Sequence, residues 1–142
     1  MDSFREQKRQ LLLEHLRRHV DGEVRFDAPS RKLYATDASL YQILPLGVVI
    51  PRTPEALLCC VQIALETRTP IVPRGGGTSL SGQSIGPGVV VDCSKYLNSL
   101  IRLDVPGRRA VVGPGIVLDQ LNRLLSPHGL QFGPDVSTAS RA

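Results

Sequence analysis

The sequence predicts an α+β fold, in which a small parallel β-sheet with a crossover helix is followed by a β-hairpin and a second helix. Short runs of β-branched residues at 48–50, 71–72 and 89–92 are typical of buried strands. The stretch between the first two runs has the apolar spacing of a helix with one buried face. Two further alternating runs flank Pro106 and Gly107, which indicates a hairpin.

The N-terminal part of the chain begins with a predicted helix at residues 3–20, where leucines and a valine recur at helical spacing. The cationic side chains on its other face could suggest a membrane surface or a partner. A solvated face is favoured, because the apolar side of the helix is narrow. From 23 to 45 the pattern is irregular, and residues 28–30, Ala-Pro-Ser, are expected to form a turn. We therefore divide the chain into a helix with a lead-in segment, residues 1–40, and a domain at residues 41–142.

The crossover helix has clear sequence boundaries. Thr53 and Pro54 supply an N-cap and a proline at the first helical position. The helical pattern ends before Pro70. The strand at 71–72 should therefore lie parallel to the strand at 48–50, with a right-handed connection between them.

The second half of the chain is predicted to start with the hairpin, which pairs residues 101–105 with 108–112. A Gly-Pro-Gly break at 113–115 then precedes a helix with one apolar face. A turn at 126–129 should end this helix, and a short strand is expected at 130–132.

The stretch with the strongest chemical signal is the loop at residues 73–88, which is rich in glycine and hydroxylated residues. Glycine permits φ > 0 and a close approach of the backbone to a ligand, which we expect at Gly76 in particular. Successive amides in such a loop form a nest for anions, and the Arg74 cation suits a phosphate or pyrophosphate. The loop matches neither a P-loop nor the Gly-x-Gly-x-x-Gly fingerprint. A plain surface turn between two strands is the alternative.

Three blocks of the chain resemble a known family when they are taken in order. They are Gly47-Val48-Val49-Ile50-Pro51, Pro73-Arg74-Gly75-Gly76-Gly77-Thr78-Ser79-Leu80-Ser81-Gly82-Gln83 and Phe132-Gly133-Pro134-Asp135-Val136-Ser137-Thr138. The order and spacing are similar to those of the FAD-linked oxidases of the vanillyl-alcohol-oxidase type, which share a PCMH-type FAD-binding domain. Within them the chain looks most like the branch of glycolate oxidase, D-lactate dehydrogenase and D-2-hydroxyglutarate dehydrogenase. The resemblance covers residues 34–142 and implies the first subdomain of that FAD-binding domain, truncated at its C-terminal side.

The resemblance also implies a function and a set of cofactor contacts. The chain would be the FAD-binding part of a flavin-dependent oxidoreductase that oxidises a 2-hydroxy acid such as D-lactate, glycolate or D-2-hydroxyglutarate. The residues implied to contact FAD are Arg74, Gly75, Gly76, Gly77, Thr78, Ser79, Gln83, Ser84, Pro134, Asp135 and Ser137. No catalytic residue or metal ligand is implied within the chain. The loop holds no His or Cys that could attach the flavin, so FAD is expected to bind non-covalently.

The same resemblance places the substrate and the electron acceptor in domains outside these residues. Some members of the branch are fused to iron–sulfur domains, so an iron–sulfur cluster would also lie outside them. Residues 1–142 alone are therefore expected to be inactive, because they supply one wall of the ligand site. They are also expected to expose an apolar surface that favours self-association. A non-catalytic module that binds a nucleotide or phosphate is the alternative.

Composition argues against several other classes of function. The chain of 142 residues carries a net charge of +4, but its cations are scattered and its aromatic content is 4%, so nucleic-acid binding is not expected. The three cysteines lack metal or disulfide spacing, and the pair His15 and His19 lacks a third ligand. Asp37 has no acidic or His neighbour along the chain, so we expect a turn role for it. No apolar run approaches the roughly 20 residues of a membrane span, and no signal-peptide core is seen. We expect a cytoplasmic protein, or a membrane-peripheral one as part of a longer enzyme.

Overall fold

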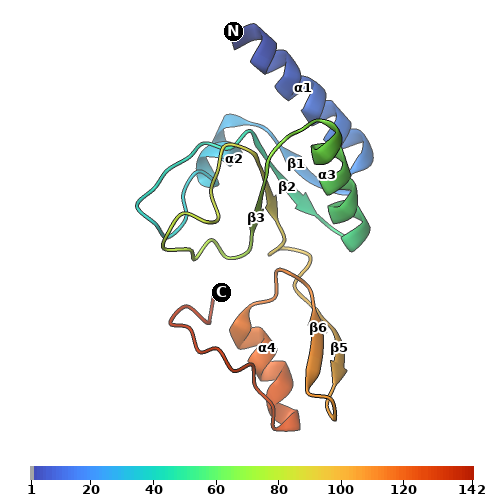
Figure 1. Ribbon diagram of the computed structural model, residues 1–142, viewed down its shortest axis with the longest axis vertical. Coiled ribbons are helices and arrows are strands. Elements are labelled where there is room, and N and C mark those ends of the chain that lie inside the picture. The colour runs from blue at the N-terminus through green and yellow to red at the C-terminus, as the bar shows by residue number, and fades with distance from the viewer. Residues whose placement is uncertain (1) are drawn as a thin grey trace.

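A computed structural model describes the backbone of residues 2–142 and the side chains of residues 6–142. It confirms the α+β architecture. The elements in chain order are α1 (Asp2–His19), β1 (Gly22–Arg25), α2 (Ala28–Leu33), β2 (Gly47–Pro51), α3 (Pro54–Glu66), β3 (Ile71–Arg74), β4 (Val89–Asp92), β5 (Leu100–Asp104), β6 (Arg109–Val112), α4 (Leu118–Leu125) and a short 3-10 helix, η1 (Ser126–His128). Figure 1 shows an elongated molecule, with the larger sheet near α1 and the β5–β6 hairpin with α4 at the other end.

The larger sheet has the strand order β1-β2-β4-β3. β2 and β3 are each parallel to β4, so the predicted parallel relation of β2 and β3 is confirmed, although β4 lies between them. Val90 of β4 is opposite Val48 on one side and Val72 on the other. The apolar run of β4 suits this central place, because a central parallel strand is buried on both faces.

The core lies on the face of the sheet that α1 and α3 cover. Leu16 of α1 and Cys60 of α3 pack against Val49 and Val91 in one buried cluster. The opposite face holds a smaller cluster of Val48, Ile50 and Val90, against which Tyr34, Val72 and Tyr96 pack. The predicted helix cap is confirmed, since the Thr53 hydroxyl accepts a hydrogen bond from the Ala56 amide at 3.1 Å.

Two elements occupy the first part of the segment that we predicted to be irregular, so that prediction is wrong up to residue 33. Residues 34–45 hold no helix and no named strand, as expected. β1 pairs antiparallel with β2 at the edge of the sheet. The expected turn at 28–30 is the first turn of α2, where the Asp27 side chain accepts from the Ser30 amide at 2.8 Å. α2 has no buried residue and therefore no apolar period to reveal it. Its N-cap and early proline are the same signal that marked α3.

The second half of the chain folds as predicted up to the end of α4. β5 and β6 pair antiparallel, and α4 is followed by η1 and by Gly129 with φ 66°, the left-handed geometry that ends helices. The strand expected at 130–132 is wrong. No strand is present there, and the Phe132 amide donates to the Asn122 side chain on α4 at 2.9 Å. This stretch follows α4 back along its side instead of joining a sheet edge.

Candidate functional site

The candidate site is the Gly-rich loop, which we define as residues 75–88, between the carboxyl end of β3 and the start of β4. It contains no helix or strand. The left-handed backbone lies at Gly77 and Gly82, with φ of 67° and 77°. Our expectation of φ > 0 at Gly76 is therefore wrong, and Gly76 matters for a different reason, a close contact described below.

Backbone donors gather in the first turn of the loop. Within the described part of the chain, the amides of Gly76, Gly77, Thr78 and Ser79 donate no hydrogen bond. Consecutive free amides around a left-handed glycine are the arrangement that binds anions such as phosphate. The side of Gly75 that would carry a Cβ faces open space, with no atom within 4 Å. The loop therefore offers unpaired donors on an accessible surface.

The side chains in the second turn of the loop hold the loop itself. The Ser79 hydroxyl accepts from the amides of Ser81 and Gln83 at 3.2 and 3.1 Å, and it also contacts the Gln83 side-chain oxygen. Such local hydrogen bonds from a serine hydroxyl stabilise a turn. The residues expected to contact the cofactor at positions 79 and 83 are thus linked to each other.

Arg74 lies at the entrance of the loop, but its guanidinium is directed to protein groups. One nitrogen, Nη1, donates to the carbonyl oxygens of Thr36 at 2.9 Å and Ser84 at 3.3 Å. The guanidinium carbon is 5.2 Å from the centre of the Tyr34 ring, which is cation–π geometry. Arg74 therefore ties the loop to the segment that precedes β2.

Asp37 makes a second tie between the same two segments. Its Oδ2 atom accepts from the Ser84 hydroxyl at 3.0 Å, and its Oδ1 atom accepts from the Ser39 amide at 2.9 Å. Hydrogen bonds from Ser39, and then from Ser84, lower the pKa of Asp37 to about 2, so it is a carboxylate near neutral pH. The predicted turn role of Asp37 is confirmed. Ser84 is buried in this contact.

The C-terminal segment reaches the loop through Arg141 rather than through the residues we named. Pro134, Asp135 and Ser137 are exposed. The Arg141 carbonyl oxygen lies against Gly76 and would be 1.9 Å from a Cβ at that position. Figure 1 shows the chain end folded back between α4 and the larger sheet.

The same chain end caps α4. The carbonyl oxygens of Ala139 and Ala142 accept from the amides of Asp119 at 3.0 Å and Leu118 at 2.7 Å. Two of the four free amides at the start of a helix are thereby satisfied. Residues 138–142, which we call the strap, therefore connect α4 to the Gly-rich loop.

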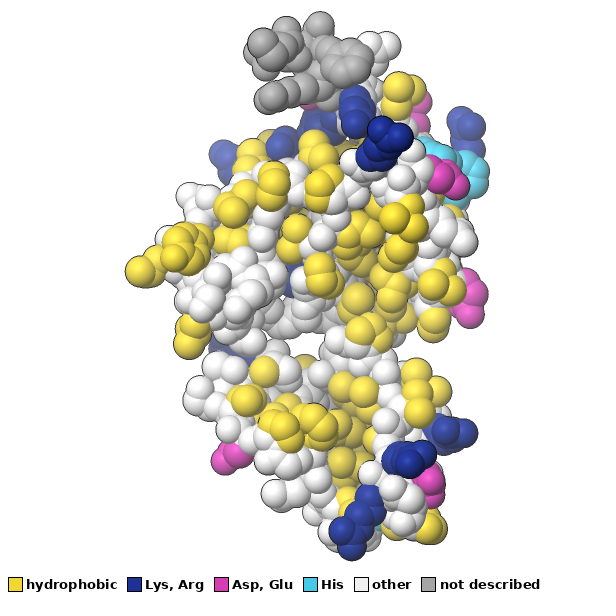
Figure 2. Space-filling model, viewed as in Figure 1, with side chains coloured by type: hydrophobic (Ala, Val, Ile, Leu, Met, Phe, Trp, Pro, Cys, Tyr) yellow, Lys and Arg dark blue, Asp and Glu magenta, His cyan; other side chains and the backbone are white. Residues whose placement is uncertain are grey.

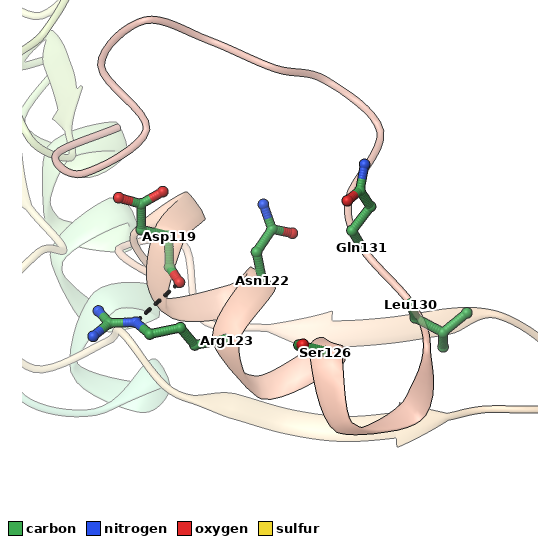
Figure 3. Close-up of a pocket in the computed structure, with 6 residues that line it drawn as sticks. All are labelled: Asp119, Asn122, Arg123, Ser126, Leu130 and Gln131. Atoms are coloured by element: carbon green, nitrogen blue, oxygen red, sulfur yellow. Dashed lines mark hydrogen bonds between the residues drawn. The ribbon is translucent and has the colours of Figure 1, made fainter.

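One cavity of the described residues is lined by residues outside the loop. It has a volume of about 620 Å³ and lies along α4, as Figure 3 shows. Its lining residues are Asp119, Asn122, Arg123, Ser126, Leu130 and Gln131. The Arg123 Nε atom donates to the Asp119 carbonyl within the helix at 3.2 Å, so this donor of the Arg123 side chain is already used within α4. The loop differs from this surface in presenting consecutive backbone amides that donate no hydrogen bond.

Two other clusters considered in the sequence have structural explanations. The rings of His15 and His19 are 4.8 Å apart, edge to face, and residues 6–142 contain no group of three side chains suited to a metal ion. Cys60 is fully buried in the core, and burial raises the pKa of its thiol to about 12. Cys93 is buried in the same core cluster, and Cys59 is half-buried against it. None of the helices described here is long and apolar enough to cross a membrane.

Comparison with known proteins identifies the family of the chain. The sequence profile of the FAD binding domain matches residues 45–142, which include the whole Gly-rich loop and the strap. The chain belongs to the FAD-binding domain family. The resemblance stated from the sequence is therefore confirmed.

Curated relatives of this FAD-binding domain lie in the expected branch. D-2-hydroxyglutarate dehydrogenase of Pseudomonas putida is 40% identical over 124 residues, which are 85% of this chain and 12% of that protein. Glycolate oxidase subunit GlcD of Bacillus subtilis is 34% identical over 123 residues, 84% of this chain and 26% of that protein. The chain thus spans about a tenth to a quarter of the length of these relatives.

Solved structures confirm the fold of the FAD-binding domain. An alkyldihydroxyacetonephosphate synthase matches with a TM-score of 0.77 at 21% identity, over 89% of this chain and 26% of that chain. p-Cresol methylhydroxylase matches with a TM-score of 0.68 at 20% identity, over 87% of this chain and 25% of that chain. The predicted PCMH-type fold is therefore confirmed.

Sequence reasoning missed the contact that fixes Tyr34. Its hydroxyl donates to Asp92 Oδ2 at 2.5 Å, across 58 residues of sequence. Burial, followed by the hydrogen bond to Asp92, raises the pKa of Tyr34. Tyr34 is the first residue of the range that resembles the family, but a contact over this separation leaves no local pattern along the chain.

Proposed function

We propose that this chain is the FAD-binding part of a flavin-dependent oxidoreductase that acts on a 2-hydroxy acid. The observation that supports the proposal is the set of free amides at 76–79, in a loop that the FAD-binding family profile covers. These amides suit the FAD pyrophosphate, which is an anion with many acceptor oxygens. The substrate class comes from the relatives, whose names are D-2-hydroxyglutarate dehydrogenase, glycolate oxidase and D-lactate dehydrogenase.

Different residues take different parts in this proposed site. The amides of Gly76, Gly77, Thr78 and Ser79 bind the pyrophosphate, and the open face of Gly75 admits it. The hydroxyl of Thr78 and the side chain of Gln83 lie on the same loop and add polar contacts. Pro134, Asp135 and Ser137 stay proposed as a neighbouring wall. Bound flavin supplies the redox chemistry, and binding is non-covalent.

Several finer proposals go with this function. The 2-hydroxy acid, the electron acceptor and an iron–sulfur cluster would be bound by parts of a longer protein. The location would be cytoplasmic or membrane-peripheral. Self-association of residues 1–142 is proposed at Leu40, Tyr41 and Leu80, which are 103%, 61% and 78% exposed on neighbouring loops. Figure 2 shows apolar side chains across the visible face and the Lys and Arg side chains mainly near its two ends.

Titration of the ¹⁵N-labelled chain with FAD and with ADP tests the proposed loop directly. Because the chain forms one wall of the site, we expect weak binding, with the largest amide shifts at residues 75–79. Riboflavin, which lacks the pyrophosphate, should leave these amides unchanged. If millimolar FAD and ADP do not shift the loop amides, the proposal is wrong.

A matched pair of glycine variants sharpens this test. Gly75 and Gly133 each have open space where a Cβ would stand, and neither has a left-handed backbone. Gly75→Ala should therefore keep the free energy of unfolding but weaken ADP binding, because its methyl group occupies the side of the loop that admits phosphate. Gly133→Ala should change neither quantity. Equal ADP affinities for both variants would show that phosphate does not approach Gly75.

A further inference from the structure

A small group of side chains, those of Tyr34, Asp37 and Arg74, holds the Gly-rich loop in place. The Arg74 guanidinium lies directly beneath Gly77, where a Cβ would come within 2.5 Å of the Nη2 atom. Its Nη1 atom holds the carbonyls of Thr36 and Ser84. Gly77 is thus the residue that lets the free amides fold over the guanidinium.

Tyr34 fixes the other side of the guanidinium. Its ring packs against Arg74, and its hydroxyl donates to Asp92 at the end of β4. The Asp92 side chain is buried, and its Oδ1 atom accepts from the Ser94 amide and hydroxyl at 2.8 and 2.6 Å. Asp92 is also the register partner of Arg74 across β3 and β4. The Tyr34 ring, which packs on the Arg74 guanidinium, is therefore anchored to the end of the central strand β4.

The segment at 36–38 fastens the loop at two further points. The Ala38 amide donates to the Gly77 carbonyl at 3.1 Å, and Asp37 accepts from Ser84. Arg74, Gly77 and Ser84 are thus all attached to the segment at 36–38. A glycine-rich backbone loses much conformational entropy when it is ordered, so such attachments reduce the cost of presenting its amides.

We propose that Tyr34, Asp37 and Arg74 form a brace that positions the anion-binding amides of the loop, and that Arg74 acts through the loop rather than as a phosphate ligand. This inference rests on the proposed function for the identity of the ligand. It differs from the expectation that Arg74 contacts the pyrophosphate. Residues of the brace are positioning residues, because each makes a contact that holds the loop or the Arg74 guanidinium. Arg74 Nη1 donates to the carbonyls of Thr36 and Ser84, Asp37 accepts from Ser84, and Tyr34 donates to Asp92.

Tyr34→Phe tests the brace with a minimal change. The variant keeps the ring against Arg74 and removes the hydroxyl that Asp92 accepts from. We expect the Kd for ADP to rise by about tenfold, as for the loss of one hydrogen bond to a charged group. The dependence of Kd on salt should stay as in the wild type, because no charge near the phosphate is lost. The loop amides of the ligand-free variant should broaden or split.

Tyr96→Phe is the matched control. Tyr96 also donates its hydroxyl to a carboxylate, that of Glu23 at 2.8 Å, and packs on the same face of the sheet. Its polar and cation–π contacts are with Glu23, Arg52 and Lys95, which lie outside the loop. Its ADP affinity should equal that of the wild type. A tenfold loss in this control would mean that any weakening of this face reduces binding, which overturns the brace.

Arg74→Lys and Arg74→Ala separate the brace from a direct phosphate contact. Lysine keeps the charge but cannot hold two carbonyls and stack on Tyr34 as a planar guanidinium does. If Arg74 is part of the brace, both variants lose ADP affinity to a similar extent. Wild-type affinity in Arg74→Lys, with a reduced salt dependence in Arg74→Ala, would overturn the proposal in favour of a direct contact.

Different experimental results would contradict the brace and the proposed function. If the wild type binds neither ADP nor FAD, the proposed function is wrong, and the brace is then judged by the loop amides of the ligand-free Tyr34→Phe variant. Changed loop amides there would support the brace without a nucleotide ligand. Unchanged loop amides in that variant would overturn it.

Discussion

Glu23 on β1 offers a sharp test of how the N-terminal segment is attached to the sheet. Its Oε1 atom accepts from the Tyr96 hydroxyl at 2.8 Å and pairs with Lys95, and its Oε2 atom pairs with Arg25. The Glu23 side chain is 17% exposed. These contacts, that of Lys95 first, lower the pKa of Glu23 from 4.5 to about 2. We predict that Glu23→Gln destabilises the fold near neutral pH.

The magnitude follows from linkage. A fall of the pKa of Glu23 from 4.5 to about 2 corresponds to at most about 3 kcal/mol. Lys95 is 50% exposed and Arg25 is 40% exposed, so solvent screening reduces the expected loss to about 1–2 kcal/mol. Because the folded-state pKa is depressed, this stability is fully present above pH 4.5. It is lost as the pH falls from there towards 2.

Urea unfolding of the wild type and Glu23→Gln at pH 7 and at pH 3 measures both parts of the prediction. The difference in free energy of unfolding should be about 1–2 kcal/mol at pH 7 and about half of that at pH 3. Glu6→Gln is the control, because Glu6 is 63% exposed and pairs with Arg9 along one helix. It should change stability by less than about 0.5 kcal/mol. A Glu23→Gln difference that is equal at both pH values would refute the linkage argument.

Two further substitutions test the packing that supports the loop. Gly76→Ala should displace the strap, because the new Cβ meets the Arg141 carbonyl. Hydrogen exchange of the amides at the start of α4 should then become faster, whereas Gly75→Ala should leave this exchange rate unchanged. Leu16→Ala should lower the free energy of unfolding by about 3 kcal/mol, since Leu16 is 1% exposed in the main core. The control Leu11→Ala should lower it by less than about 0.5 kcal/mol, because Leu11 is 62% exposed. Protected α4 amides in the first case, or equal losses in the second, would contradict the assigned contacts.

The sequence was sufficient to predict the elements that show a regular apolar pattern or a helix-capping motif. The apolar runs of β2 and β4 are buried on both faces, and α3 has a Thr-Pro start, so both kinds of element were predicted. β1 and α2 were not, because β1 has four half-buried residues and α2 buries none. β1 is positioned by its pairing with β2, and α2 begins at the cap formed by Asp27. Neither feature is visible as an apolar pattern in the sequence.

The candidate site was predictable in its position but not in its internal contacts. Glycine content and strand ends located the loop, since both are properties of neighbouring residues. The role of Gly76 depends on Arg141, and the orientation of Arg74 depends on Thr36 and Tyr34. Such contacts arise when distant segments fold together, so no local spacing encodes them.

The contacts of the loop also bear on where the FAD-binding unit begins. The family profile starts at residue 45, and our division of the chain falls between 40 and 41. The groups that hold Arg74 and Ser84, however, belong to Thr36 and Asp37. A glycine-rich loop without these attachments would have to be ordered by the ligand itself, and the cost would appear as lost affinity. The lead-in segment is therefore better treated as part of the same structural unit as the loop than as a preceding domain, because it supplies contacts that hold the loop in place.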